Sequence, residues 1–181
     1  MELTGSHIIN ASAPQIWAML MNPDTLAKVT PGISKLELER EGFYKAVADI
    51  KMGPVSGRFE GSAEVLEPVI NESFVLKIVQ NSKIGNVDAN VRMMLKPVSS
   101  FQTELSFEGV ADMSGLLART GQRVMAGVAN TLTKQFFSNF ETELATIPQV
   151  DSEKVVPAIE RVTVEIGFFQ KIINWLKSFF Q

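Results

Sequence analysis

Few side chains in this sequence are suited to acid–base or nucleophilic chemistry. The chain has one histidine, His7, one tyrosine, Tyr44, and no cysteine. His7 alternates with Gly5 and Ile9 in a segment of strand character, where a lone histidine is more often structural or surface-exposed than catalytic. The hydroxyl of Tyr44 is placed to hydrogen-bond a ligand. Without a Ser-His-Asp order or a pair of histidines, we expect no catalytic residue, no metal site and a protein that is not an enzyme.

Charge excludes one class of partner and leaves one candidate anion site. The formal net charge is −3, which gives no electrostatic basis for binding nucleic acid. Arg119 and Arg123 lie one helical turn apart near the start of a predicted helix, in positions suited to a phosphate or a partner carboxylate. A solvated helix face is the simpler explanation of this pair.

Alternating and helical patterns predict the elements that position these residues. Residues 33–113 alternate between apolar and polar side chains with short breaks, which predicts six antiparallel strands joined as hairpins. Residues 2–11 predict a further strand, and two short helices follow, the first starting at Ser12 with Pro14 in its first turn. Residues 115–145 change to a helical period. We expect an α+β fold in which a curved sheet of about seven strands wraps around a long helix.

The inward-facing side of the predicted sheet is rich in small residues. Glycine within a strand marks strong bending or the close approach of another body, and methionines on the same face suit an adaptable apolar pocket. A packed helix that leaves no void is the alternative reading. We predict a ligand cavity lined by Tyr44, Met52, Phe59, Gly61, Ala63, Val91, Met93, Phe107, Gly109, Val128, Leu132 and Phe136.

The last fourteen residues, 168–181, read FFQKIINWLKSFFQ and divide cleanly into an apolar and a polar helical face. Such a helix is about 21 Å long, too short for a hydrocarbon core of about 30 Å, but it can lie in the membrane surface. Packing of the stripe on the protein's own core or on a partner is the alternative. We predict membrane binding by Phe168, Phe169, Lys171, Ile172, Ile173, Trp175, Leu176, Lys177, Phe179 and Phe180.

Domain organisation and location follow from these assignments. Residues 1–146 form the predicted ligand-binding domain, residues 147–166 a linker with two prolines, and residues 167–181 the amphipathic helix. The amino terminus lacks the basic and apolar regions of a signal peptide. We therefore expect a cytoplasmic protein, peripheral on the inner face of the cytoplasmic membrane.

Several short motifs carry a resemblance to a known family. They are Ala13-Pro14 with Ile16-Trp17, then Pro31-Gly32, Gly53-Pro54-Val55 with Gly57, Phe59 and Gly61, and finally Gly121-Gln122-Arg123 with Gln135-Phe136-Phe137 and Asn139-Phe140. In this order and spacing, over roughly residues 1–146, the chain resembles the carbon monoxide dehydrogenase CoxG family, within the START-like (SRPBCC) helix-grip superfamily.

The resemblance implies a non-enzymatic accessory protein of a molybdenum hydroxylase of the carbon monoxide dehydrogenase type. Such a protein recruits its enzyme to the cytoplasmic membrane and binds an apolar lipid such as a quinone, menaquinone or ubiquinone, with no covalent cofactor. Two alternatives stay open. Helix-grip enzymes such as cyclases and hydrolases act on apolar substrates in the same hollow, and the terminal helix could instead dock a partner enzyme on a scaffold that needs no ligand.

Overall fold

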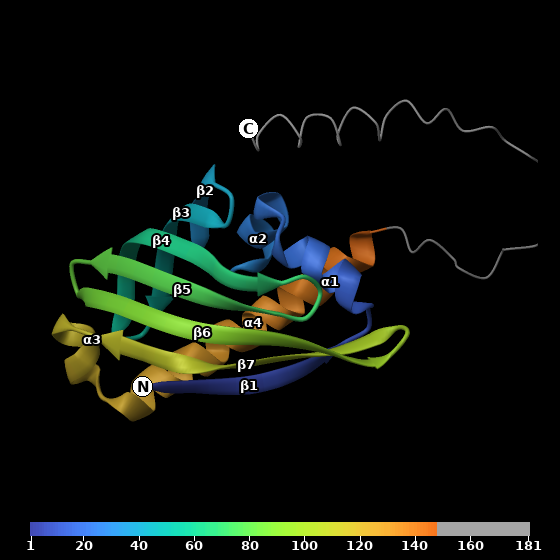
Figure 1. Ribbon diagram of the computed structural model, residues 1–181. Coiled ribbons are helices and arrows are strands. Elements are labelled where there is room, and N and C mark those ends of the chain that lie inside the picture. Colours follow the sequence, from blue (N-terminus) through green and yellow to red (C-terminus); the bar gives the residue numbers. More distant parts are fainter. Residues whose placement is uncertain (148–181) are drawn as a thin grey trace, which may run out of the picture. The chain divides into compact units, whose positions relative to one another are not determined.

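The computed structural model describes residues 1–147, which form one compact unit. Seven antiparallel strands make a single sheet in the order β1-β7-β6-β5-β4-β3-β2, so that β1 and β2 are its edges (Figure 1). The predicted meander and the seven-stranded helix-grip arrangement are confirmed. The elements are β1 (Glu2–Ile9), α1 (Ala13–Leu20), α2 (Pro23–Val29), β2 (Ile33–Arg40), β3 (Phe43–Met52), β4 (Val55–Val69), β5 (Ser73–Ser82), β6 (Gly85–Ser99), β7 (Gln102–Met113), α3 (Gly115–Thr120) and α4 (Gln122–Thr146).

The two short helices start where the sequence places their start signals. Each has a proline in its first turn, where the missing backbone N–H costs no hydrogen bond. The side chain of Asn22 caps α2, because its Oδ1 accepts from the backbone nitrogens of Asp24 and Thr25 at 2.9 and 3.2 Å. Ser12 occupies the cap position of α1 but makes no side-chain capping bond.

The helix predicted for residues 115–145 is in fact two helices. α3 ends at Thr120, and Gly121 has a φ of 94°, a conformation that a side chain disfavours. Val124, placed on the buried stripe by the helical period, is exposed because α4 begins only after this break. The buried side of α4 is instead formed by Met125, Phe137, Phe140 and Leu144.

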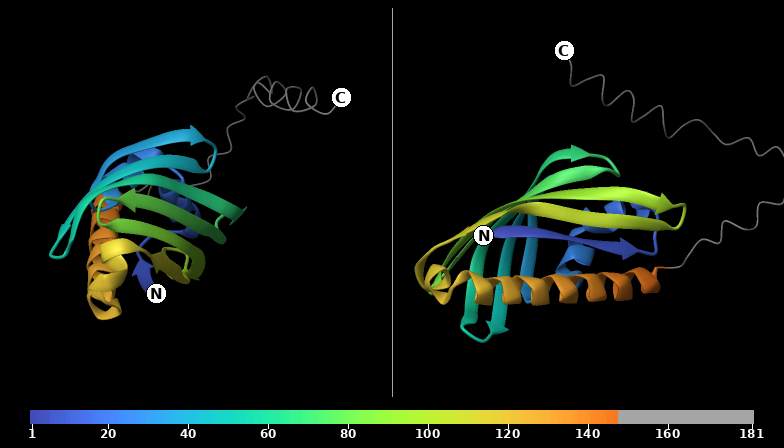
Figure 2. Two further views of the ribbon diagram at one scale, coloured as in Figure 1. Left: turned by 90° about the vertical axis from the view of Figure 1, so that its left-hand side faces the viewer. Right: turned by 90° about the horizontal axis from the view of Figure 1, so that it is seen from below.

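Glycines allow the sheet to bend around α4 (Figure 2). A Cβ atom at Gly61 of β4 would lie 1.9 Å from the carbonyl oxygen of Val79 in β5, and one at Gly109 of β7 would lie 2.1 Å from the carbonyl oxygen of Asn90 in β6. No side chain fits at these distances. The small residues seen in the sequence are therefore required, at these two positions, by the close approach of neighbouring strands.

Three apolar clusters fill the space between the sheet and the helices. The first joins α1, α2 and the end of α4 to the sheet and contains Ile16, Phe74, Leu105 and Phe140. The second lies under α3 and contains Phe59, Leu117 and Met125. Between them is a small third cluster of Ala89, Val91 and Ala111. The large side chains thus gather toward the two ends of the concave face, and small ones lie at its centre.

α4 is also joined to α2 by polar contacts. Lys28 Nζ lies 2.5 Å from Glu143 Oε1, and Asn139 Nδ2 donates a hydrogen bond of 3.2 Å to the carbonyl oxygen of Val29. Across residues 1–147, the helices are all too short or too polar to cross a membrane. The predicted linker and the amphipathic helix at residues 167–181 lie outside the described residues, apart from Ile147.

Candidate ligand pocket between β1 and α4

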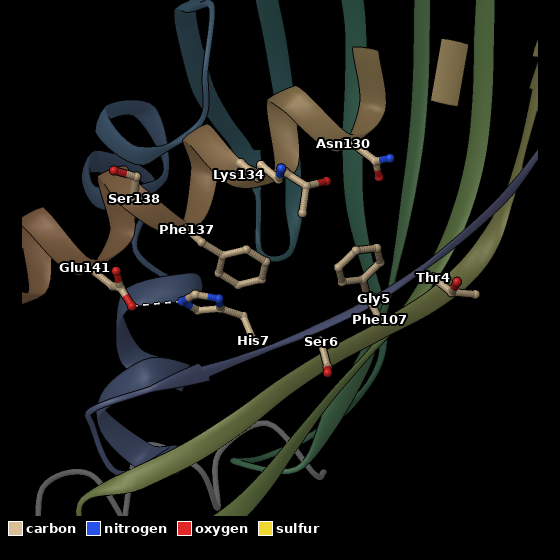
Figure 3. Close-up of a pocket in the computed structure, with 11 residues that line it drawn as sticks. Thr4, Gly5, Ser6, His7, Phe107, Asn130, Lys134, Phe137, Ser138 and Glu141 are labelled. Atoms are coloured by element: carbon tan, nitrogen blue, oxygen red, sulfur yellow. Dashed lines mark hydrogen bonds and ion pairs between the residues drawn. The ribbon is translucent and has the colours of Figure 1, made fainter. Parts of the chain in front are cut away.

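A pocket of about 380 Å³ opens between the edge strand β1 and the long helix α4. Strand geometry turns Gly5 and His7 to the same side, and the helical period of α4 presents successive turns along the gap (Figure 3). The residues that line the pocket are Thr4, Gly5, Ser6 and His7 of β1, Phe107 of β7, and Asn130, Thr133, Lys134, Phe137, Ser138 and Glu141 of α4.

One end of the pocket is closed by His7. Its Nε2 lies 2.8 Å from Glu141 Oε1, and its ring stacks on Phe137 with ring centroids 4.5 Å apart (Figure 3). The histidine side chain is 37% exposed and the glutamate 47%. This contact ties the edge strand to α4 across 134 residues of sequence. The pair is therefore a clasp between the two elements that form the pocket.

The opposite wall is formed by Phe107. A Cβ atom at Gly5 would lie 2.5 Å from Phe107 Cζ, so the ring rests directly on the glycine. Phe107 also packs against the third cluster at the centre of the concave face. The pocket therefore reaches from the solvent at the β1 edge to the small-residue region of the sheet.

The lining is apolar inside and polar at the rim. Phe107 and Phe137 supply aromatic surface, and Lys134, Glu141 and Asn130 supply charged and amide groups from α4. Apolar walls with a few polar groups are typical of sites for small molecules that carry a polar head. Within residues 1–147 there is no group of three carboxylates and histidines that could hold a metal ion.

Two polar side chains lie on the concave face away from this pocket. Tyr44 is 4% exposed, and burial raises the pKa of its hydroxyl. Gln80 is two strands away, opposite Gly61, and its buried Oε1 has no hydrogen-bond partner among the described residues. Buried amide oxygens normally have a partner, so this atom marks the centre of the concave face as a place for a polar group. The alternation of β5 places Gln80 on this face, although its residue type alone does not indicate a site.

The twelve residues predicted to line a cavity all lie on or near the concave face, but they do not form one pocket. Phe107 lines the pocket at β1. Phe59 and Val128 pack in the second cluster, Val91 and Met93 in or against the third, and Phe136 against the first. Tyr44 is buried, and the remaining members are half-buried: Met52, Gly61, Ala63, Gly109 and Leu132.

Four of the pocket residues on α4 lie outside the apolar stripe from which the sequence predicts a cavity. They are Asn130, Lys134, Ser138 and Glu141, which recur at intervals of three or four residues on one side of the helix. That spacing is visible in the sequence. What it faces is not, since the partner is a strand more than a hundred residues earlier. Arg119 and Arg123, the predicted anion candidates, are exposed and have no ion pair within the described part of the chain.

A second hollow lies at the end of the sheet where α1 begins. Its volume is about 660 Å³, and it is bounded by the turn between β4 and β5, the late part of β6 and the first residues of α1. Its lining residues are Ala13, Pro14, Ile70, Asn71, Glu72, Ser73, Leu95, Lys96 and Pro97.

Solved structures with the same fold extend these observations. A conserved protein from Geobacillus kaustophilus is 30% identical, with a TM-score of 0.78, over 80% of this chain and 95% of that one. A START superfamily protein from Mycobacterium smegmatis is 14% identical, with a TM-score of 0.64, over 80% and 97% of the two chains. The Zhui aromatase/cyclase from a Streptomyces species is 13% identical, with a TM-score of 0.60, over 80% and 93%.

The last two likenesses show the START-like fold alone. Among curated proteins, none matches the sequence significantly. The family model that describes the carbon monoxide dehydrogenase protein CoxG matches residues 5–145, which is almost all of the described domain. The chain belongs to the carbon monoxide dehydrogenase CoxG family.

Proposed function

We propose that this protein is an accessory subunit that binds an apolar molecule with a polar head, such as a quinone, and recruits a molybdenum hydroxylase to the cytoplasmic membrane. The observation that supports ligand binding is the pocket between β1 and α4, with aromatic walls inside and charged groups at its rim. A quinone has this same division, with a polar ring and an apolar tail.

Support for the partner comes from the family description, which names a subunit of carbon monoxide dehydrogenase. Support for membrane recruitment comes from the sequence of residues 168–181, whose apolar and polar faces suit the membrane surface. In this proposal the domain takes a quinone from the bilayer and presents it to the enzyme. Electrons from the hydroxylase then reach the membrane pool, although neither protein spans the bilayer.

Ligand extraction and rebinding test the proposal. Protein purified gently should yield an isoprenoid quinone in its organic extract, and delipidated protein should rebind added menaquinone. Thr133 lines the pocket, so Thr133→Phe fills it and should weaken rebinding by about tenfold or more. Thr142→Phe places the same side chain on α4 outside the pocket, and this control should bind as the parent does. An extract without isoprenoid, from protein that also fails to rebind menaquinone, contradicts the proposal.

An enzyme of the cyclase type is the second candidate. The observation that favours it is the bond of 2.8 Å between His7 and Glu141, since a histidine oriented by a carboxylate is a common general base. A carrier releases its ligand chemically unchanged, whereas an enzyme converts it. Menaquinone recovered intact after prolonged incubation, with parent and His7→Ala protein alike, favours the carrier.

A further inference from the structure

Exposed apolar side chains gather on two turns at one end of the domain. Ile70 and Phe101 are each 73% exposed, and Val69 and Val98 are about half exposed beside them. We call these four residues the tip patch. Such turns normally carry polar residues, glycine or proline, because their side chains stay in water. A phenylalanine and an isoleucine at the most exposed points of two neighbouring turns therefore require a partner surface.

The backbone holds these side chains outward. In the turn between β4 and β5, the nitrogen of Glu72 donates to the carbonyl oxygen of Val69 at 2.9 Å, and Leu95 of β6 donates to Glu72 at 2.7 Å. In the turn between β6 and β7, the backbone nitrogen of Phe101 donates to Ser99 Oγ at 3.3 Å. Both turns are thus closed by hydrogen bonds, so their conformation presents the apolar side chains to the outside.

The tip patch lies at the end of the domain where the described chain finishes. The two turns, α1 and the last turn of α4 are at the same end in Figure 1, and Leu95 and Ala13 pack in one cluster with Leu144. The chain continues from there through residues 148–167, which can span at most about 70 Å. The apolar segment at 168–181 can therefore reach any surface that the tip patch touches.

The form and charge of this end favour lipid over a protein partner. The apolar side chains protrude from separate turns, whereas a stable dimer needs about 800 Å² of fitted surface on each partner. Glu72 and Lys96 balance each other beside the hollow between the turns, so no net charge opposes an anionic membrane. We propose that the tip patch is a second membrane-binding site, with Ile70 and Phe101 inserted at the headgroup level. This inference rests on the proposed membrane role.

Site-specific labelling tests the inference in the full chain. Because the chain has no cysteine, Phe101→Cys, Ile70→Cys and the control Leu116→Cys each provide one position for an environment-sensitive dye. Leu116 is 51% exposed on α3, at the opposite end of the sheet. With vesicles of equal parts phosphatidylcholine and phosphatidylglycerol, dye emission should shift to the blue at the first two positions and stay unchanged at the third.

Binding measurements provide the matched loss of function. Phe101→Ser combined with Ile70→Ser should weaken vesicle partitioning by about tenfold, since two inserted side chains are lost. Leu116→Ser combined with Val124→Ser removes two exposed apolar side chains at the opposite end and should leave partitioning unchanged.

The outcomes separate this inference from the proposed function. If the protein floats with vesicles but the dyes at positions 70 and 101 do not respond, the tip patch is not a membrane site, although the membrane role stands. If the dyes are already shielded without lipid, and mutation of residues 168–181 exposes them, the chain's own tail covers the patch and the inference is wrong. If the full chain does not bind vesicles at all, the inference fails together with the membrane role.

Discussion

Tyr44 makes the interior of the domain measurable at the scale of one residue, because the chain has no second tyrosine. Burial raises the pKa of its hydroxyl above the ordinary value of 10.0. A group with a raised folded pKa holds its proton more tightly when folded, so its stabilising contribution is complete below the unfolded pKa and is lost as pH rises through the folded pKa. We expect the free energy of unfolding to fall above about pH 10.

Tyrosinate absorbance measures this directly. In the folded protein it should appear at higher pH than in the urea-unfolded chain. Tyr44→Phe should remove this component of the alkaline loss of stability and leave the remainder. Equal titration midpoints in the folded and unfolded protein would contradict the assignment of Tyr44 to the interior.

At the scale of elements, the curvature of the sheet depends on Gly61. A Cβ atom there would lie 1.9 Å from a backbone oxygen of β5, which cannot move without breaking the strand pairing. Gly61→Ala should therefore lower the free energy of unfolding by about 2–3 kcal/mol, through strain and local loss of the ladder. Denaturant titration measures the change.

Gly57 provides the matched control on the same strand. A Cβ atom there meets only side-chain atoms, at 3.8 Å or more, which is ordinary van der Waals contact. Gly57→Ala should be neutral or slightly stabilising, because alanine reduces the entropy of the unfolded chain. Equal destabilisation by both substitutions would show that glycine entropy, and not strand approach, explains the effect at Gly61.

The elements were predictable to different degrees. Period-two alternation with short breaks gave the six hairpin strands, since local pattern and turn length together determine an antiparallel meander. The break at Gly121 was not predicted, because one glycine is tolerated within a helical pattern and only its φ of 94° separates α3 from α4. Hydrogen bonding in the first turn of α4, unlike residue type, cannot be read from a periodic pattern.

At the scale of the molecule, the fold was predictable and the pocket was not. The motif resemblance led to the family that the comparisons show, and the concave face was assigned correctly from the small residues. The pocket depends instead on contacts such as that of His7 with Glu141, which join residues 134 positions apart. Local patterns carry no information about such a pair, so the sequence alone favours a structural or surface role for a lone histidine.

The last prediction concerns how the domain reaches the membrane. In the proposed function, residues 168–181 bind lipid through one helical face, so a pair of charges on that face should abolish binding. Ile172→Glu combined with Leu176→Glu places two carboxylates among the apolar side chains, where burial in the headgroup–acyl boundary is unfavourable. Flotation with vesicles that contain phosphatidylglycerol should then fall by about tenfold or more, from a cost of about 1 kcal/mol or more for each charge.

The control carries the same charge change on the polar face. Gln170→Glu combined with Asn174→Glu also removes two units of net charge, so it has the same electrostatic repulsion from the anionic surface but leaves the apolar face intact. It should retain most of the binding at moderate salt, because screening weakens the repulsion. If both pairs reduce flotation equally, electrostatics alone attach the protein. If neither does, the terminal segment does not bind lipid, and docking of a partner enzyme becomes the better explanation of its apolar face.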